Sequence, residues 1–201
     1  MNDNKERIEV KNLFQTQYNI SLTDIPISNE QPSPDFEYCL DNKRIFVMEL
    51  KTLELVVPSK KTKFHKSDYG FWQKIDKSPS KLAHLIKDAQ KQLTQYIEPK
   101  ILTFLSTSSL DFTDLTTTLS GKTTYHNQNN LDEKITFNNY EYITKSNLKY
   151  IKNIDLYIWI NTPNNLNNYE FEINFVPITK MGQEIRGQYF IQRQIAGSHS
   201  K

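Results

Sequence analysis

The sequence predicts an α/β fold, in which helices and β-strands alternate along one domain. Apolar residues recur at three- and four-residue steps over 4–18 and 82–97, which is the pattern of amphipathic helices. Two β-rich runs, 35–40 and 43–53, lie between these helices, and a further run at 101–105 follows the second helix. The length of 201 residues is that of one compact domain.

The first part of the chain carries a local signal for each element. Val10, Leu13 and Phe14 place an apolar stripe on the first helix, and acidic residues precede them. Three prolines between residues 20 and 34 then discourage helix and suit an extended entry into a sheet. The dipeptide Asp41-Asn42 separates the two β-rich runs and tolerates the positive φ of tight turns, so we expect a β-hairpin.

The second helix is bounded by proline at both ends. Ser78 can cap it, Pro79 can occupy its first position, and Pro99 stops its pattern. The strand at 101–105 leads into a Ser- and Thr-rich region, in which we expect a short helix near 112–119.

The last third of the chain predicts a second hairpin. Strands at 154–160 and 169–176 flank an Asn-rich turn, and a further short strand is expected at 188–191. The segment 106–150 between the two parts has no recognisable motif, and we assign no role to it.

Composition excludes several classes of function. The five glycines form neither Gly-x-Gly-x-x-Gly nor Gly-x-x-x-x-Gly-Lys, which excludes the phosphate loops of dinucleotide-binding and P-loop proteins. Cys39 is the single cysteine, so an intrachain disulfide and a cysteine-based zinc site are excluded. The net charge of +2 does not by itself indicate a polyanion partner. No signal segment or membrane-spanning run is present, so we expect a cytoplasmic protein with no membrane partner.

Acidic and basic side chains converge on the predicted hairpin. Pro34-Asp35 opens its first strand, and Glu49-Leu50-Lys51 lies on its second strand. Because side chains alternate along a strand, Glu49 and Lys51 share one face, about 7 Å apart. Asp35 can approach Glu49 from the adjoining strand, and two close carboxylates repel each other unless a cation neutralises them. The pattern therefore predicts a Mg²⁺ site, in which Mn²⁺ could substitute.

These residues resemble the signature of the PD-(D/E)xK, or restriction-endonuclease-like, nuclease superfamily. That signature is a Pro-Asp, a spacer and an acid-x-Lys on the next strand, here Pro34-Asp35 and Glu49-Leu50-Lys51. The resemblance implies a restriction-endonuclease-like core, a mixed central β-sheet flanked by helices in the order α-β-β-β-α-β, over about residues 4–105. Extra C-terminal strands at about 150–195 would complete a single nuclease-like domain over residues 1–201.

The resemblance also implies a metal-dependent nuclease that hydrolyses phosphodiester bonds. Asp35 and Glu49 would be the metal ligands, with Mg²⁺ as the cofactor. Lys51 would stabilise the charge that develops in the transition state, and the product would carry a 5′-phosphate.

Three further residues are assigned to the catalytic site by the resemblance. Many members of the superfamily carry a Gln-x-x-x-Tyr on the next helix, which Gln92 and Tyr96 match, and helical periodicity lets both face the sheet. Ordinary helix packing is the alternative for this pair. Members frequently add a Glu from the first helix, and Glu6 projects with Val10 and Leu13, although an acid near a helix start also stabilises the helix dipole.

A basic and aromatic segment follows the acid-x-Lys strand. Its lysines, Lys60, Lys61, Lys63 and Lys66, precede several aromatic rings, a mixture that contacts phosphates and stacks bases. We expect this segment to bind nucleic acid, DNA in preference to RNA. A solvated loop whose rings pack onto the body is the alternative.

Two functions remain open at this point. The first is a Mg²⁺-dependent restriction, repair or defence endonuclease, acting as a homodimer or as a single subunit. The second is a module that keeps the fold and binds nucleic acid or protein without cleaving. The nuclease should lose cleavage without unfolding on Glu49→Ala or Lys51→Ala, whereas the module should show no such dependence.

Overall fold

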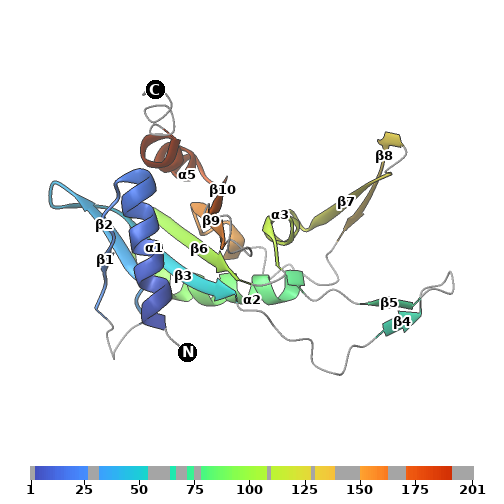
Figure 1. Cartoon of the computed structure of the whole chain (residues 1–201), viewed down its shortest axis with the longest axis horizontal. Helices are drawn as coiled ribbons and strands as arrows, with labels where there is room; N and C mark the ends of the chain where they lie inside the picture. Colours follow the sequence, from blue (N-terminus) through green and yellow to red (C-terminus); the bar gives the residue numbers. More distant parts are fainter. Residues whose placement is uncertain are drawn as a thin grey trace.

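A six-stranded mixed sheet with helices against both of its faces forms the body of the protein (Figure 1). The computed structural model describes residues 3–26, 32–53, 64–66, 72–74, 78–107, 110–127, 130–138, 150–162 and 171–191. The predicted α/β class, with a mixed sheet between helices, is confirmed.

The sheet has the strand order β1-β2-β3-β6-β9-β10. The strands are β1 (Thr23–Asp24), β2 (Phe36–Leu40), β3 (Lys43–Leu53), β6 (Lys100–Ser106), β9 (Leu156–Asn161) and β10 (Glu172–Pro177). β3, β6 and β9 are mutually parallel, whereas β1, β2 and β10 are antiparallel to their neighbours. The predicted C-terminal hairpin is therefore present as β9 and β10. Parallel central strands need long crossovers, which the helical segments between them supply.

β2 and β3 form the predicted first hairpin. Leu40 pairs with Lys43, and the turn residues Asp41 and Asn42 have φ of 51° and 61°. Positive φ at both central positions is the geometry of a two-residue type I′ turn, whose twist matches that of the flanking strands. The turn sets the register near Leu40, and a one-residue shift between Tyr38 and Cys39 then gives the register that brings the two halves of the acidic motif together.

Helices cover both faces of the sheet. α1 (Asp3–Tyr18) lies on one face, together with α5 (Lys180–Ile185) and the π-helix η1 (Arg186–Ile191) that continues it. α2 (Ser78–Leu93) and α3 (Phe112–Ser120) lie on the other face (Figure 1). The helices predicted at the N-terminus and near 112–119 are confirmed.

Each face of the sheet has its own apolar core. On the α1 side the core includes Val10, Leu13, Phe14, Phe36, Phe46, Met48, Ile158 and Phe190. On the α2 side it includes Val47, Leu82, Ile86, Ala89, Leu93, Phe104, Tyr157 and Trp159. β3 contributes to both cores, so a charged residue in the middle of this strand has little access to water.

The strand predicted at 188–191 is wrong, because these residues lie in η1. Tyr189 and Phe190 have the aromatic character that favours a strand locally. In the structure they continue the helical turns of α5, and Phe190 is buried in the α1-side core. A short apolar run does not distinguish the two conformations, so packing decides.

The second helix ends earlier than its pattern predicts. α2 stops at Leu93, and the amide of Tyr96 donates to Leu93 O in a tighter turn. Pro99 disfavours helical backbone at Glu98, and the chain bends there toward β6 before the apolar pattern is exhausted. The prediction that Tyr96 lies on this helix is therefore wrong.

Two ribbons outside the main sheet have no counterpart in the sequence prediction. They are β4 (Phe64–Lys66) with β5 (Trp72–Lys74), and β7 (Lys122–Asn127) with β8 (Asn130–Asn138). Both project from the body (Figure 1). Within the described ranges, no helix combines the length and the hydropathy needed to cross a bilayer.

Candidate active site

Asp35 directly precedes β2 and faces β3. Phe36 pairs with Met48, so one step back along the antiparallel register sets Asp35 opposite Glu49. The backbone amide of Leu50 donates to Asp35 Oδ2 over 2.8 Å, which directs the carboxylate toward β3. The hairpin therefore brings together the two carboxylates that the sequence places on its two strands.

Glu49 lies on the α2 side of β3 with an exposed fraction of only 1%. Lys51 Nζ lies 2.6 Å from Glu49 Oε1, as expected for side chains on one face of a strand. Glu49 Oε2 is buried and has no hydrogen-bond partner among the described residues. A buried acceptor without a donor costs free energy, so this oxygen is available to a cation or to a proton.

The surroundings of Glu49 favour its protonated form. Burial is the largest cause that raises the pKa of Glu49. The nearby charge of Asp35, and the hydrogen bond that a protonated Glu49 can donate to Asp35, raise it further, whereas Lys51 lowers it, and the pKa is left at about 7. A carboxyl group with such a pKa exchanges between proton and cation near neutral pH. Perturbed groups of this kind concentrate at functional sites.

Gln92 connects Lys51 to the loop that carries Asp35. Its Oε1 accepts a hydrogen bond from Lys51 Nζ over 3.2 Å, and its Nε2 donates to Ser33 O over 3.3 Å. Gln95 adds a second link, donating to Pro32 O over 2.8 Å. The sequence singles out Gln92, but it carries no signal for Gln95, whose partner is 63 residues away.

Arg7 of α1 reaches the same loop from the opposite face of the sheet. Its Nη1 pairs with Asp35 Oδ1, and its Nη2 donates to Asp35 O over 2.8 Å and to Asp24 Oδ1 over 2.9 Å. Its guanidinium lies over the ring of Phe36, 4.6 Å from the centroid. Sequence reasoning misses Arg7, although its position three residues before the buried Val10 is a signal that could identify it.

Glu6 has no hydrogen bond or ion pair with Asp35 or Glu49 among the described residues, and its contact with a metal ion or water stays a prediction. The contact of α1 with Asp35 is made by the neighbouring Arg7. Asp24 of β1 also binds Lys11 Nζ over 2.7 Å, and Lys11 and then Arg7 hold the pKa of Asp24 below its usual value. The first helix thus contributes cations to this region of the structure.

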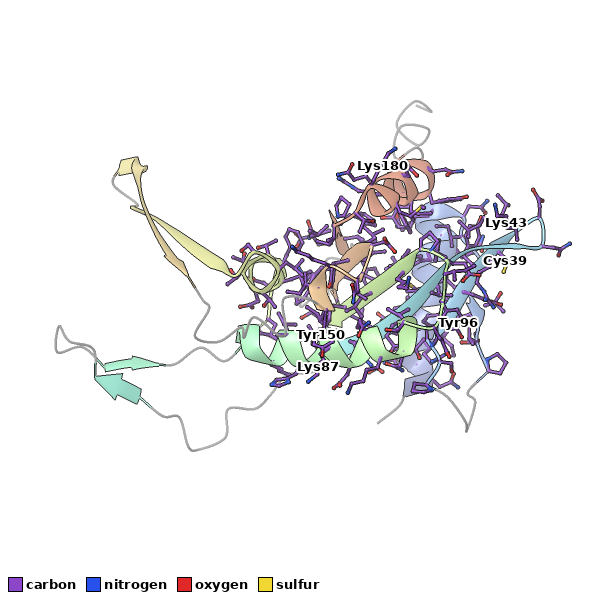
Figure 2. All side chains as sticks on the ribbon, turned by 180° about the vertical axis from the view of Figure 1, so that it is seen from behind. Cys39, Lys43, Lys87, Tyr96, Tyr150 and Lys180 are labelled. Atoms are coloured by element: carbon purple, nitrogen blue, oxygen red, sulfur yellow. The ribbon has the colours of Figure 1, made fainter. Side chains whose placement is uncertain are left out.

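Within the described part of the chain, no hydrogen bond joins Tyr96 to Glu49 or Lys51. Figure 2 shows it beyond the end of α2, on the side where the labelled Cys39 and Lys43 mark the β2–β3 hairpin. The Arg44 guanidinium lies over its ring, 5.4 Å from the centroid. Tyr96 is also partly buried against the α2-side core, as the alternative of ordinary packing predicts.

The predicted nucleic-acid-binding lysines fall in the least described part of the chain. Lys60, Lys61 and Lys63 lie outside the described residues. Lys66 is the last residue of β4, and its backbone alone is described. The expectation that this segment binds nucleic acid stays a prediction.

The donor set at the site fits a hard divalent cation. Mg²⁺ is commonly held by one or two carboxylates, and waters and substrate phosphates complete its shell. Asp35 and Glu49 supply two carboxylates, and the unpartnered Glu49 Oε2 is an oxygen of the required kind. Among the side chains that the structure describes, no group of three or more His, Cys, Asp or Glu residues could hold a metal ion, so any ion here would depend on these two.

Comparisons with family models, with curated proteins and with solved structures found no match to this chain. The interpretation of the site therefore rests on its geometry and chemistry. The group consists of Asp35, Glu49, Lys51 and Gln92, with Arg7 added by the structure.

Proposed function

We propose that this protein is a metal-dependent nuclease of the PD-(D/E)xK type that hydrolyses phosphodiester bonds in DNA in preference to RNA. One observation carries the proposal. Glu49 is buried beside a second carboxylate, with one oxygen on Lys51 and the other without a partner in the described structure. A buried carboxylate in this arrangement lowers the free energy of unfolding, so stability does not account for it. It is typical of a site that binds a cation together with an anionic substrate.

The order of elements supports the same proposal at the level of the core. The elements of the main body follow in the order α1, β1, β2, β3, α2 and β6, with the separate ribbon of β4 and β5 inserted between β3 and α2. This order agrees with the core that the motif implies. The acidic hairpin lies where α1 and α2 approach it from opposite faces of the sheet.

The residues of the site have distinct roles in this proposal. Asp35 and Glu49 would hold Mg²⁺ or Mn²⁺, which when bound supplies Lewis-acid stabilisation of the phosphoryl group and acidifies water. Lys51 places a positive charge beside Glu49 and can stabilise the extra negative charge that the phosphoryl group carries in the transition state. Gln92 holds the amine of Lys51 and the Asp35 loop in fixed relation.

A cleavage assay tests the proposal directly. The purified protein is incubated with Mg²⁺ or Mn²⁺ and with supercoiled, linear or single-stranded DNA, alongside Lys51→Ala. The matched control is Lys43→Ala, which removes an exposed lysine from the same strand. Cleavage should need the divalent ion, disappear in Lys51→Ala and persist in Lys43→Ala.

A second candidate function is supported by a different observation. Each carboxylate already has a cation from the protein, Arg7 on Asp35 and Lys51 on Glu49. A site neutralised in this way suits a module that keeps the fold and binds nucleic acid without cleaving it. This alternative predicts that the protein slows the migration of DNA in a gel-shift experiment. The shift should persist when a chelator is added, and no variant should cleave the DNA.

A further inference from the structure

Arg7 is held more firmly than a surface arginine would be. Its guanidinium reaches three acceptor atoms, Asp35 Oδ1, Asp35 O and Asp24 Oδ1, and it covers the ring of Phe36. A side chain with so many fixed partners is poorly placed to be an incidental surface charge. Arg7 also contacts Asp35, which is a candidate metal ligand, so its charge affects any ion bound there.

Asp35 does not need Arg7 for its orientation. Its Oδ2 already accepts the Leu50 amide over 2.8 Å, which turns the carboxylate toward Glu49. Arg7 instead occupies the second oxygen, Oδ1, which a cation ligated by Asp35 could also use. A guanidinium and a divalent ion at one carboxylate repel each other and compete for its lone pairs.

The remaining contacts of Arg7 are independent of Oδ1. Its Nη2 binds Asp24 Oδ1 over 2.9 Å and the backbone oxygen of Asp35 over 2.8 Å, and neither atom belongs to the Asp35 carboxylate. The side chain would therefore stay near the site after the Nη1 contact was lost. Nη1 would then be a donor beside the candidate metal site, and a guanidinium donor suits a phosphate oxygen.

We propose that Arg7 is the resident cation of the site, which a divalent ion displaces from Asp35 Oδ1, after which Nη1 contacts a phosphate oxygen of the substrate. The inference rests on the proposed function, because it assumes the Asp35 and Glu49 ion site. It adds a substrate-contacting residue from α1. Together with Lys51 on Glu49, it also supplies a positive charge for each of the two carboxylates in the absence of a metal ion.

The first experiment measures Mn²⁺ affinity by titration calorimetry in the absence of nucleic acid, with Glu49→Ala to identify the site. Arg7→Gln should bind Mn²⁺ about tenfold more tightly than the unaltered protein, because a competing charge is removed. Asp24→Asn should bind it about threefold more weakly, because Arg7 then has one carboxylate fewer and binds Asp35 more strongly.

Lys11→Gln is the matched control for general charge. It removes the same charge from the same helix, one turn further along, and it contacts Asp24 rather than Asp35. It should change Mn²⁺ affinity by less than about twofold. An increase equal to that of Arg7→Gln would overturn the proposal, since the effect would then come from net charge alone.

A single-turnover cleavage measurement at saturating Mn²⁺ tests the phosphate contact. Arg7→Gln should cleave at least tenfold more slowly although it binds the ion more tightly. If Arg7 had a purely structural role, Arg7→Gln would reduce the Mn²⁺ affinity and the cleavage rate together. An unchanged cleavage rate would overturn the proposed phosphate contact.

The outcomes separate this inference from the proposed function. If the unaltered protein binds Mn²⁺ and cleaves DNA, but Arg7→Gln binds the ion equally or less well, the inference fails and the nuclease proposal stands. If neither protein binds Mn²⁺, both fail. If Arg7→Gln bound Mn²⁺ and the unaltered protein did not, the result would support a strong competition between Arg7 and the ion for Asp35 Oδ1.

Discussion

Glu49 is the residue at which burial and charge conflict most directly. It lies in the middle of a strand that contributes apolar side chains to both cores, and its pKa is raised to about 7. Lys51 offsets part of the cost through one oxygen, but Oε2 has no partner among the described residues. An ionised Glu49 therefore lowers the stability of the fold unless a cation joins it.

Glu49→Gln should stabilise the protein at high pH and not at low pH. The carboxyl pKa is about 7 in the folded state against 4.5 in the unfolded state, so the folded state binds the extra proton between these values. The stability of the unaltered protein therefore falls as pH rises through this window. At pH 8 and without divalent ions, the glutamine variant should be more stable by about 3 kcal/mol.

Chemical unfolding of both proteins at about pH 4 and pH 8 tests the expected change in free energy of unfolding. The difference should vanish at the lower pH, where the carboxyl group is protonated in both states. A constant difference at both pH values would show that the charge of Glu49 is not the cause.

At the scale of elements, a junction at the start of β9 holds the C-terminal helices against the sheet. Asp155 Oδ2 accepts the Lys100 amide over 2.9 Å, and its Oδ1 accepts the hydroxyl of Thr179 over 2.6 Å. Thr179 caps α5 by accepting the Gly182 amide over 3.1 Å. The side chain of one aspartate thus links β6, β9 and the start of α5.

Gly182→Ala should destabilise the protein by about 2–4 kcal/mol. A Cβ at this position would overlap the backbone carbonyl of Asp155, and backbone does not move aside as a flexible side chain can. The matched control is Gly187→Ala in η1, where a Cβ would meet nothing within 4 Å. The control should stay within about 0.5 kcal/mol or become more stable.

Thermal unfolding of the two alanine variants distinguishes packing from helix propensity. Propensity alone would make both substitutions neutral or favourable, because alanine is the better helix former. A loss confined to Gly182→Ala would locate the constraint at the contact of α5 with β9. Equal losses would contradict it.

At the scale of the whole molecule, the site lies where the two layers of helix meet one hairpin. Arg7 reaches Asp35 from the α1 side, and Gln92 reaches Lys51 from the α2 side. The contacts of Arg7 and Gln92 are with partners 28 and 41 residues away in the sequence. The site can therefore form only when both layers are packed, which couples its integrity to the fold as a whole.

Divalent ions should accordingly stabilise the folded protein. Binding to the native state alone adds about 2.7 kcal/mol at 100 times the dissociation constant. For a chain of 201 residues that corresponds to a rise in melting temperature of about 5–10 °C. The rise should be absent in Asp35→Asn, and removal of the ion with a chelator should reverse it in the unaltered protein.

Much of the fold follows from relations between near neighbours in the sequence. The first helix, the hairpin over β2 and β3 and the short α3 all match their predicted ranges closely. The errors lie where local preference was weak or overruled, as at η1 and at the end of α2. The ribbons outside the main sheet carry too little apolar periodicity to be predicted.

In the candidate site, too, some relations follow from near neighbours in the sequence and others from tertiary packing. Alternation along β3 is enough to place Glu49 and Lys51 on one face. The turn at Asp41 and Asn42 pairs Leu40 with Lys43, and a one-residue register shift between Tyr38 and Cys39 then sets Asp35 opposite Glu49. These are consequences of backbone geometry over a few residues.

Only the tertiary structure decides what surrounds that motif. The burial of Glu49, the contact of Gln92 with the Asp35 loop, and the presence of Arg7 on Asp35 all depend on how α1 and α2 pack against the sheet. The sequence by itself determined the hairpin and the shared face of Glu49 and Lys51, because backbone dihedrals and side-chain alternation act between neighbours. The register shift between Tyr38 and Cys39, which sets Asp35 opposite Glu49, is known only from the structure. Packing determined the electrostatics of the two carboxylates, because desolvation and long-range ion pairs exist only once distant segments meet.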